Sequence, residues 1–311
     1  MVSVLMAVYK ESIQYIKESV MSIINQTYRN LEIIIVIDDP CNHQAKDFLK
    51  AVAMSDTRVK LIFNDENLGL IKSLNKGIKA VSGDYIARMD ADDVCDLDRI
   101  RKELGYLLQN RCDLVGCAVD RINEDGDLVG KGHIYSGEDS MISQILKIDN
   151  FIPHPTWLVK TCVYSRLNGY REIFACEDYD FLLRASDYGY KIGLCREILL
   201  QYRINMSGIS RKNSFKQLIT SCYLHKHIHE IHSIDLHKLQ SFVNRVYTET
   251  KAEKYESALL MYDHSLIQIK EGDIVSGIQT LLKAIMKSRF VLIKGVHLIR
   301  MRLLALAKKK A

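Results

Sequence analysis

The sequence is poor in proline and in signals of export or membrane insertion. It holds only three prolines, and no stretch is rich enough in proline, glycine and serine to form a flexible linker. No apolar run reaches the roughly 18 residues of a membrane-spanning helix. The first residues, "MVSVLMAVYKES", lack the basic start and cleavage site of a secretory signal. We therefore expect a cytoplasmic protein without a transmembrane span.

Paired cysteine motifs are also missing. The chain has eight cysteines but no CxxC pair, so the spacing indicates neither a zinc knuckle nor a redox motif. Scattered cysteines of this kind are typical of thiols kept reduced in a cytosol.

Acidic residues are absent from the last part of the chain. The net charge is +5, but no Asp or Glu follows Asp273, whereas nine Lys and Arg residues do. Subtracting those nine from +5 leaves −4 for residues 1–273. A basic tail on a mildly acidic body predicts a negatively charged partner for the tail alone. The acidic body and the lack of a recognised binding module argue against nucleic acid.

Strands and helices alternate in the first third of the chain. Apolar, β-branched runs predict strands over residues 2–9, 31–38, 59–64 and 84–89. Apolar residues at helical spacing predict helices between them, the third ending at Gly83. This alternation predicts an α/β fold with a parallel sheet. Three polar clusters, "AVYKE", "DDP" and "DADD", then fall at the edge of the sheet where such folds bind ligands.

The rest of the chain divides into a mixed and a helical part. Residues 111–210 read as strands, a hairpin and helices, and the pattern is all-helical from about residue 213. We predict a catalytic domain over 1–210, with a nucleotide-binding half (1–110) and an acceptor-binding half (111–210). The remainder, 211–311, forms a helical C-terminal region.

The stretch "YIARMDADDV" concentrates negative charge at a strand end. Asp90 and Asp92 lie two residues apart, so their side chains point the same way on an extended backbone. Two convergent carboxylates form a hard-oxygen site for Mg²⁺ or Mn²⁺, which share their coordination with substrate phosphates. A solvated acidic turn that leads into the next helix, capped by Asp96 or Asp98, is the alternative that these residues leave open.

Several motifs in order resemble glycosyltransferase family 2, the enzymes with the GT-A fold. They are "SVLMAVYKESIQYIKESVMSIINQTYRNLEIIIVIDD", "NLGLIKSLNKGIKAVSGDYIARMDADD", "GYREIFACEDYDFLLRASDYGYKI" and "ILLQYRINMSGIS". The resemblance covers roughly residues 2–210. It implies a Rossmann-like mixed sheet flanked by helices that binds a nucleotide-diphosphate sugar, with a helical C-terminal extension.

The resemblance assigns roles to the acids of the nucleotide half. Asp92, the second acid of the DxD motif, would be the main protein ligand to Mn²⁺ or Mg²⁺. Asp90 would contact the ribose or the water shell of the metal. Asp39 would hydrogen-bond the base of the nucleotide.

The same resemblance outlines the surroundings of the nucleotide. Ala7 and Tyr9 would line the base pocket, and Glu11 would lie close to it. Weaker matches near the nucleotide or its diphosphate are Asn67, Lys72 and Arg88, of which the two cations fit a solvated surface equally well. The family usually has Pro at position 7, Asn at position 10 and "DDGS" where this chain has "IDDPCN". UDP is the nucleotide that the family implies. These departures concern the identity of the bound base and not the fold.

Forming a glycosidic bond also needs a base for the acceptor hydroxyl. The resemblance implies that Asp178 in "CEDYD" is this base and that the reaction inverts the anomeric configuration. Spacing alone does not choose among Glu177, Asp178 and Asp180, since each fits the start of a helix.

The tail has an apolar stripe at helical spacing: Leu292, Val296, Ile299, Leu303 and Leu306. Together with the terminal lysines, it predicts a helix that lies on an anionic membrane. Packing on the catalytic domain or on a partner subunit is the other possibility.

The function implied is transfer of a sugar from a UDP-sugar to a hydroxyl of a glycan or lipid-linked acceptor in surface polysaccharide assembly, such as capsule or O-antigen. One alternative is a sugar-phosphate nucleotidyltransferase, but "AVYKES" lacks the glycine-rich phosphate loop that it would need. The other is a non-catalytic nucleotide-sugar-binding protein, against which Asp92 and Asp178 count.

Overall fold

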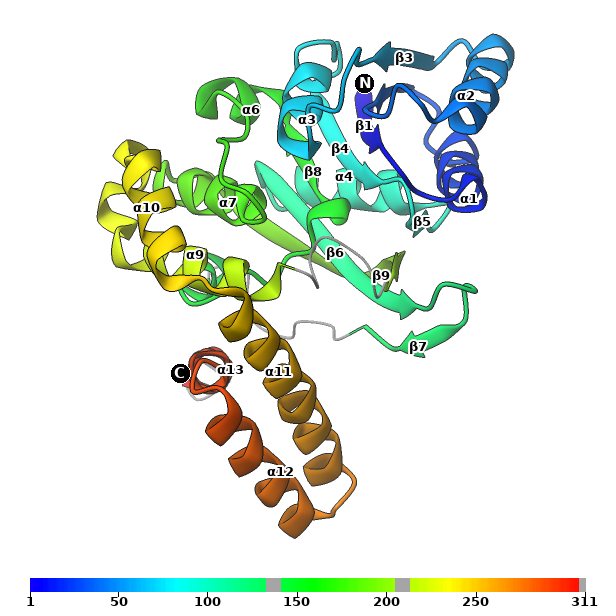
Figure 1. Ribbon diagram of the computed structural model, residues 1–311. Helices are drawn as coiled ribbons and strands as arrows, with labels where there is room; N and C mark the ends of the chain where they lie inside the picture. Colours follow the sequence, from blue (N-terminus) through cyan, green and yellow to red (C-terminus); the bar gives the residue numbers. More distant parts are fainter. Residues whose placement is uncertain (133–140, 205–212, 308–311) are drawn as a thin grey trace. The chain divides into compact units, whose positions relative to one another are not determined.

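The computed structural model describes residues 1–132, 141–204 and 213–307 (Figure 1). Contacts within the chain define two compact units. Unit 1 comprises Met1–Ser143 and Asn150–Met206, and unit 2 comprises Gln144–Asp149 and Ser207–Ala311.

Four parallel strands form the first half of the sheet in unit 1. They are β1 (Val2–Val8), β2 (Leu31–Ile37), β3 (Val59–Phe63) and β4 (Tyr85–Asp90), in the spatial order β3-β2-β1-β4. Helices α1 (Ile13–Ile24), α2 (His43–Ser55) and α3 (Leu70–Ile78) connect them. All four predicted strands are therefore confirmed.

The second half of the sheet is mixed. β8 (Leu158–Lys160) runs antiparallel to β4, and β6 (Leu114–Ile122) continues the sheet beside β8. β9 (Ile192–Arg203) runs parallel to β6 and also pairs with the short β5 (Val94–Cys95). β7 (Leu128–Gly130) forms a hairpin with β6.

Helices link the strands of this half. They are α4 (Arg99–Gln109), the 3-10 turn η2 (His154–Thr156), α6 (Thr161–Leu167) and α7 (Glu177–Asp187). The short α5 (Ile142–Leu146) has residues in both units. The mixed sheet with flanking helices confirms the GT-A fold predicted from the sequence.

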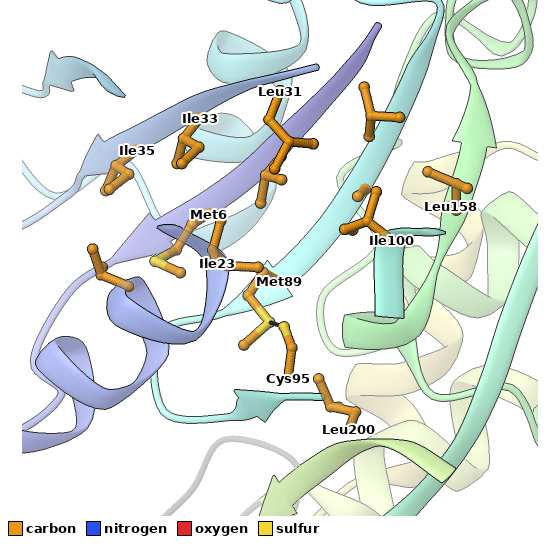
Figure 2. Close-up of a cluster of buried hydrophobic side chains, with 14 of the residues drawn as sticks. Met6, Ile23, Leu31, Ile33, Ile35, Met89, Cys95, Ile100, Leu158 and Leu200 are labelled. Carbon is orange, nitrogen blue, oxygen red and sulfur yellow. Dashed lines mark hydrogen bonds between the residues drawn. The ribbon is translucent and has the colours of Figure 1, made fainter. Parts of the chain in front are cut away.

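The central strands are buried on both faces. Met6 of β1 and Met89 of β4 belong to the cluster that α1 and α4 cover with Ile23 and Ile100 (Figure 2). Leu5 points to the opposite face, where a Cβ on Gly77 of α3 would lie only 2.3 Å from its Cδ1. Burial on both sides explains why these strands read as continuous apolar runs.

Gly83 does not end the third helix, so that prediction is wrong. α3 ends at Ile78, and Gly83 lies in the turn before β4. Its N–H donates to Ser3 Oγ at 2.9 Å and to Glu32 Oε1 at 3.1 Å. A Cβ there would come within 2.5 Å of Ser3 Oγ, so glycine is required by the close approach of the turn to β1.

Unit 2 is helical in its described residues. It contains α9 (Ser214–Lys226), the 3-10 segment η3 (Ile228–Ser233), α10 (Leu236–Val246), α11 (Glu249–Lys270), α12 (Ile274–Lys287) and α13 (Val291–Ala307). α11 and α12 approach closely at Gly277, where a Cβ would lie 3.0 Å from the carbonyl oxygen of Ser265. Among the described helices, none has the length and apolarity required to cross a membrane.

Candidate active site

The site lies in unit 1, where the parallel strands end. Ala7 of β1 is the register partner of Asp90 of β4, and Val8 is that of Ile37 in β2. This register brings the residues that follow β1, β2 and β4 to one edge of the sheet, as the sequence predicts. The "AVYKE", "DDP" and "DADD" segments are therefore neighbours.

Three carboxylates converge after β4. One oxygen from each of Asp90, Asp92 and Asp93 lies within 4.8 Å of the others. Burial raises the pKa of Asp92 to about 7, and the charges of Asp90 and Glu11 act in the same direction. Burial likewise raises the pKa of Asp93 well above its ordinary value, with Asp90 and Asp92 adding to the effect. The raised pKa values reflect burial and repulsion among the carboxylates, so the cluster favours a bound proton or cation.

Arg203 at the end of β9 holds the turn that carries this cluster. Its backbone N–H donates to Asp93 Oδ1 at 2.8 Å, and its Nε donates to the carbonyl oxygen of Asp92 at 2.9 Å. A second guanidinium nitrogen donates to Glu18 of α1 at 2.7 Å. The guanidinium is thus occupied in fixing the turn between β4 and β5.

The other carboxylate oxygen of Asp93, Oδ2, is buried and has no hydrogen-bond partner among the described residues. A buried carboxylate oxygen without a donor is costly, and a cation is the natural group to satisfy it. Oxygen donors of this kind suit Mg²⁺ or Mn²⁺. The donor set therefore fits the divalent cation that the sequence predicts, with Asp90, Asp92 and Asp93 as the residues able to hold it.

Arg88 lies behind the cluster, with only 2% of its side chain exposed. Its guanidinium forms an ion pair with Asp90. Although burial opposes its charge, Asp90 holds the pKa of Arg88 above its ordinary value. In this position Arg88 neutralises part of the acidic cluster from inside the protein, and it is not a solvated surface cation.

The second acidic group begins α7. Asp178 Oδ2 accepts a hydrogen bond from Asn150 Nδ2 at 2.9 Å. Burial raises the pKa of Asp178 to about 6, although bonds from the Tyr179 N–H and from Asn150 lower it. Burial, followed by the charge of Asp178, raises the pKa of its neighbour Glu177 to about 8. An acid with a pKa near 6 is ionised at neutral pH and is suited to accept a proton.

Asp180, the third acid of α7, lies in a different environment. It is fully buried and forms ion pairs with Arg171 and Arg184. The guanidinium of Arg184 also donates to the carbonyl oxygens of Leu167 and Gly169. Asp180 therefore anchors α7 to the preceding loop, which leaves Asp178 and Glu177 as the acids of the site.

The two acidic groups interact electrostatically across the site. The charge of Asp90 raises the pKa of Glu177, and Arg88 lowers the pKa of both Glu177 and Asp178. The DxD cluster and the start of α7 are therefore close enough to influence each other's ionisation.

The loop after β1 carries the next group of predicted residues. The N–H of Tyr9 donates to Glu11 Oε2 at 2.7 Å. Burial raises the pKa of Glu11, and the charge of Asp90 adds to this effect. Asp39 is half-buried and accepts the N–H of Cys41 at 2.8 Å. Tyr9 is tied to this second loop because its carbonyl oxygen accepts a bond from Asn42 at 3.1 Å.

Asn67 and Lys72 are exposed at the edge of the site. Asn67 Oδ1 accepts the N–H of Gly69 at 2.9 Å. Lys72 Nζ lies 3.8 Å from a carboxylate oxygen of Glu172. Lys72 is thus accessible to a ligand, whereas Arg88 is not in this conformation.

Sequence reasoning gave no role to several residues that shape the site. Asp38 is one: it is buried and accepts the N–H groups of Leu68 and Gly69 at 2.8 and 2.9 Å. It thereby fixes the loop that carries Asn67. The doubled acid in "IDD" is a sequence signal for Asp38. Asn150, the partner of Asp178, is another unpredicted residue, and it lies outside every motif.

The comparisons with known proteins agree with this geometry. The family model described as Glycosyl transferase family 2 matches residues 3–173. The chain belongs to glycosyl transferase family 2. The enzyme class predicted from the sequence, a glycosyltransferase, is thereby confirmed.

Individual relatives of this family 2 glycosyltransferase extend the comparison. An uncharacterised glycosyltransferase of Methanocaldococcus jannaschii is 36% identical over 208 residues, which cover 66% of this chain and 71% of the relative. The O-antigen biosynthesis glycosyltransferase WbnJ of Escherichia coli is also 36% identical over 208 residues, with coverage of 66% and 80%. The crystal structure of S. aureus TarS 1–349 in complex with UDP-GlcNAc superposes with a TM-score of 0.58 at 14% identity, covering 99% of this chain and 91% of that one. At this identity, the likeness to TarS concerns the fold alone.

Proposed function

We propose that this glycosyltransferase moves a sugar from a UDP-sugar to a hydroxyl of a glycan or lipid-linked acceptor, with inversion at the anomeric carbon. The observation that carries the proposal is the pairing of two acidic groups in one site. Asp90, Asp92 and Asp93 form a cluster suited to a divalent cation, and Asp178 has a pKa of about 6. Glycosyl transfer needs one group for the diphosphate and another for the proton.

Asp92 and Asp90 would hold Mn²⁺ or Mg²⁺ together with the donor's phosphates, and Asp93 is a further ligand available to it. When bound, such a cation supplies positive charge that stabilises the leaving diphosphate. Arg88 orients Asp90 from behind through their ion pair. Arg203 keeps the turn rigid through its bond to the carbonyl oxygen of Asp92.

Asp178 would remove the proton from the acceptor hydroxyl as its oxygen attacks the anomeric carbon. The new carbon–oxygen bond forms as the bond to the diphosphate oxygen breaks, so a single displacement inverts the configuration. Asn150 positions the carboxylate through its hydrogen bond to Oδ2. The proton ends on Asp178, and the electron pair leaves with the nucleotide diphosphate.

UDP as the nucleotide is supported by the TarS complex with UDP-GlcNAc. On this proposal, Ala7, Tyr9 and Asp39 bind the base, and Glu11 lies beside it. Asn67, in the loop after β3, and Lys72, in the first turn of α3, contact the ribose or the diphosphate. Surface polysaccharide assembly is supported by the name of WbnJ and by that of AmsE, an amylovoran biosynthesis glycosyltransferase of Erwinia amylovora. A cytoplasmic location stays a prediction.

Thermal unfolding with nucleotides tests the donor side. We expect UDP with Mn²⁺ to raise the melting temperature more than GDP or CDP with Mn²⁺. Asp92→Asn should abolish the shift, whereas Asp125→Asn, which removes an exposed carboxylate in the β6–β7 turn, should retain it. No shift with any nucleotide and metal would refute the donor assignment.

A panel of nucleotide sugars tests the reaction itself. Slow release of UDP from one UDP-sugar without acceptor would identify the donor. Release of pyrophosphate from UTP and a sugar 1-phosphate would instead indicate a nucleotidyltransferase. Nucleotide binding with no turnover of any donor in the presence of glycan acceptors would favour a non-catalytic binding protein.

A further inference from the structure

Unit 2 exposes rows of large apolar side chains on its last two helices. On α12 these are Ile278, Leu282 and Met286, exposed by 48%, 55% and 79%. On α13 they are Leu292, Val296, Ile299 and Leu303, exposed by 45% to 60%. The side chain of Leu306, which continues the stripe in the sequence, lies outside the described residues. A helix in a soluble protein normally turns such a stripe toward a core.

These rows do not face the packing side of their helices. On α12 the buried residues are Gly277 and Ala284, which share one side, and Gly277 touches α11. Ile278, Leu282 and Met286 follow one another at a spacing of four and lie on another side of the helix. On α13 the buried residue at the start is Val291, whereas Leu292 and Val296 are exposed. The exposed rows are therefore additional to the core of unit 2.

The same segment carries charge of one sign only. From residue 274 to the end the sequence has nine basic residues and no acidic one. Lys283 and Lys287 are exposed on α12, as are Lys294 and Arg300 on α13. Apolar rows interspersed with exposed cations are the pattern of helices that lie in a membrane interface.

A basic cavity opens where α12 leads into α13. Its volume is about 170 Å³, and it is lined by Lys251, Lys254, Lys287, Ser288, Arg289 and Phe290. Four of these six residues are cations, and none is acidic. The four residues 287–290 stand in the chain between Met286 and Leu292, so the cavity adjoins the exposed apolar rows. The positive charge around it is complementary to a phosphate group.

We propose that the α12–α13 face of unit 2 docks on an anionic lipid surface, with a lipid phosphate in the basic cavity. The apolar rows enter the boundary between headgroups and acyl chains, and the cations contact the headgroups. The same face of a second copy is a poorer occupant, because pairing the two α12–α13 faces would bring like charges together. An anionic bilayer satisfies both the apolar and the positive side chains.

Vesicle sedimentation with the full chain tests the proposal. We expect binding to vesicles of phosphatidylcholine mixed with phosphatidylglycerol, little binding to phosphatidylcholine alone, and weakening as salt is added. Each basic residue near an anionic surface contributes about 1 kcal/mol, or about fivefold. Lys287→Gln with Arg289→Gln should therefore lower partitioning about 25-fold. Val296→Ser with Ile299→Ser should also weaken binding, but without removing charge.

The matched control is Lys79→Gln with Lys270→Gln, which removes two exposed cations outside the cavity and outside residues 274–311. It should bind vesicles like the unchanged protein. Far-UV circular dichroism on heating checks that each variant is folded.

Three results would overturn the proposal. The first is equal binding to vesicles with and without phosphatidylglycerol. The second is an equal loss of vesicle binding in Lys287→Gln with Arg289→Gln and in Lys79→Gln with Lys270→Gln. The third is stabilisation by inorganic phosphate, or self-association in sedimentation velocity, with no vesicle binding. None of these measurements uses sugar transfer, so the outcome is independent of the proposed function.

Discussion

Asp178 is the residue whose removal separates chemistry from binding. It is the second residue of α7, and its carboxylate accepts a hydrogen bond from Asn150. Asp178→Asn should lower kcat by about 10²- to 10⁴-fold, the usual contribution of a general base. UDP binding should persist, as measured by the Mn²⁺-dependent thermal shift. Asp187→Asn, near the other end of the same helix, is the control and should keep full activity. Full activity in Asp178→Asn would exclude this residue as the base.

The pKa of Asp178 predicts how the rate depends on pH. A base must be ionised, so kcat/KM should be high above pH 6 and fall as the pH drops through about 6. Asn150 donates to the ionised carboxylate and lowers its pKa. Asn150→Ala should therefore move the acid limb to higher pH. The limb should stay in place in Asn244→Ala, which removes an exposed amide of unit 2. If the acid limb of kcat/KM stays at the same pH in Asn150→Ala, Asp178 is not the group whose ionisation sets it.

Site residues that stand in a local motif can be predicted from the sequence, whereas those that act through a distant partner cannot. Asp90, Asp92 and Asp178 stand in local motifs, so a resemblance to the family finds them. Arg203 stands in the "ILLQYRINMSGIS" motif, but its partner Asp92 is 111 residues away, and Asn150 acts through a partner 28 residues away. Nothing local predicts these pairings, because the fold alone brings the partners together. The burial of Arg88 was equally hidden, since an arginine in a strand gives no sign of which face it occupies.

At the scale of elements, Gly83 shows how a turn is fixed to the sheet. A Cβ at this position would meet Ser3 Oγ at 2.5 Å and the backbone nitrogen of Ser3 at 2.9 Å. Gly83→Ala should lower the free energy of unfolding by about 1–3 kcal/mol, as overpacking does. Gly105→Ala is the matched control: a Cβ there meets nothing within 4 Å on α4, so it should stabilise the helix by about 0.5–1 kcal/mol. Urea denaturation measures both. Equal effects of the two substitutions would contradict the close approach.

Glu32, which accepts a hydrogen bond from the N–H of Gly83, makes the stability of the fold depend on pH. Although burial works against its charge, bonds from Lys60, Ser3 and Ser82 lower the pKa of Glu32 to about 2. A carboxylate with a lowered folded-state pKa stabilises the fold above its unfolded value, near 4.5, and this contribution is lost as the pH falls toward 2.

Glu32→Gln should therefore be less stable than the unchanged protein by about 1–3 kcal/mol at pH 7. The difference should shrink between pH 4.5 and 2. Thermal unfolding across this range measures it. A constant difference down to the lowest pH would show that the ionised form of Glu32 is not the stabilising one.

Elements with strong local patterns were predictable and weakly patterned ones were not. β1 and β2 are buried runs made mostly of apolar residues, and β3 and β4 are short runs rich in apolar residues, so the sequence identifies all four. β8 has only three residues, and its antiparallel pairing with β4 depends on a partner more than 70 residues away. The end of α3 was missed because a glycine read as a helix stop serves a close contact instead. Local periodicity identifies elements, whereas pairing and close approach arise from the whole fold.

At the scale of the molecule, the residues assigned to the donor all belong to unit 1. The base-pocket, diphosphate and DxD residues lie on or after β1, β2, β3 and β4, whereas α9 to α13 of unit 2 carry none of them. The acidic cluster and the acid-free tail likewise belong to different units. Donor binding should therefore stabilise one unit selectively.

Hydrogen exchange measures that selectivity. A ligand at about 100 times its Kd stabilises the state that binds it by about 2.7 kcal/mol, or about 100-fold in exchange for amides that exchange through global opening. With Mn²⁺ and UDP, amides of β1, β2 and β4 should slow toward this limit, while those of α11 to α13 should exchange as before. UDP with EDTA is the control and should change neither set, since the carboxylates alone repel the diphosphate. Equal protection of both sets would mean that the two units open together, and the predicted selective stabilisation of unit 1 would then be wrong.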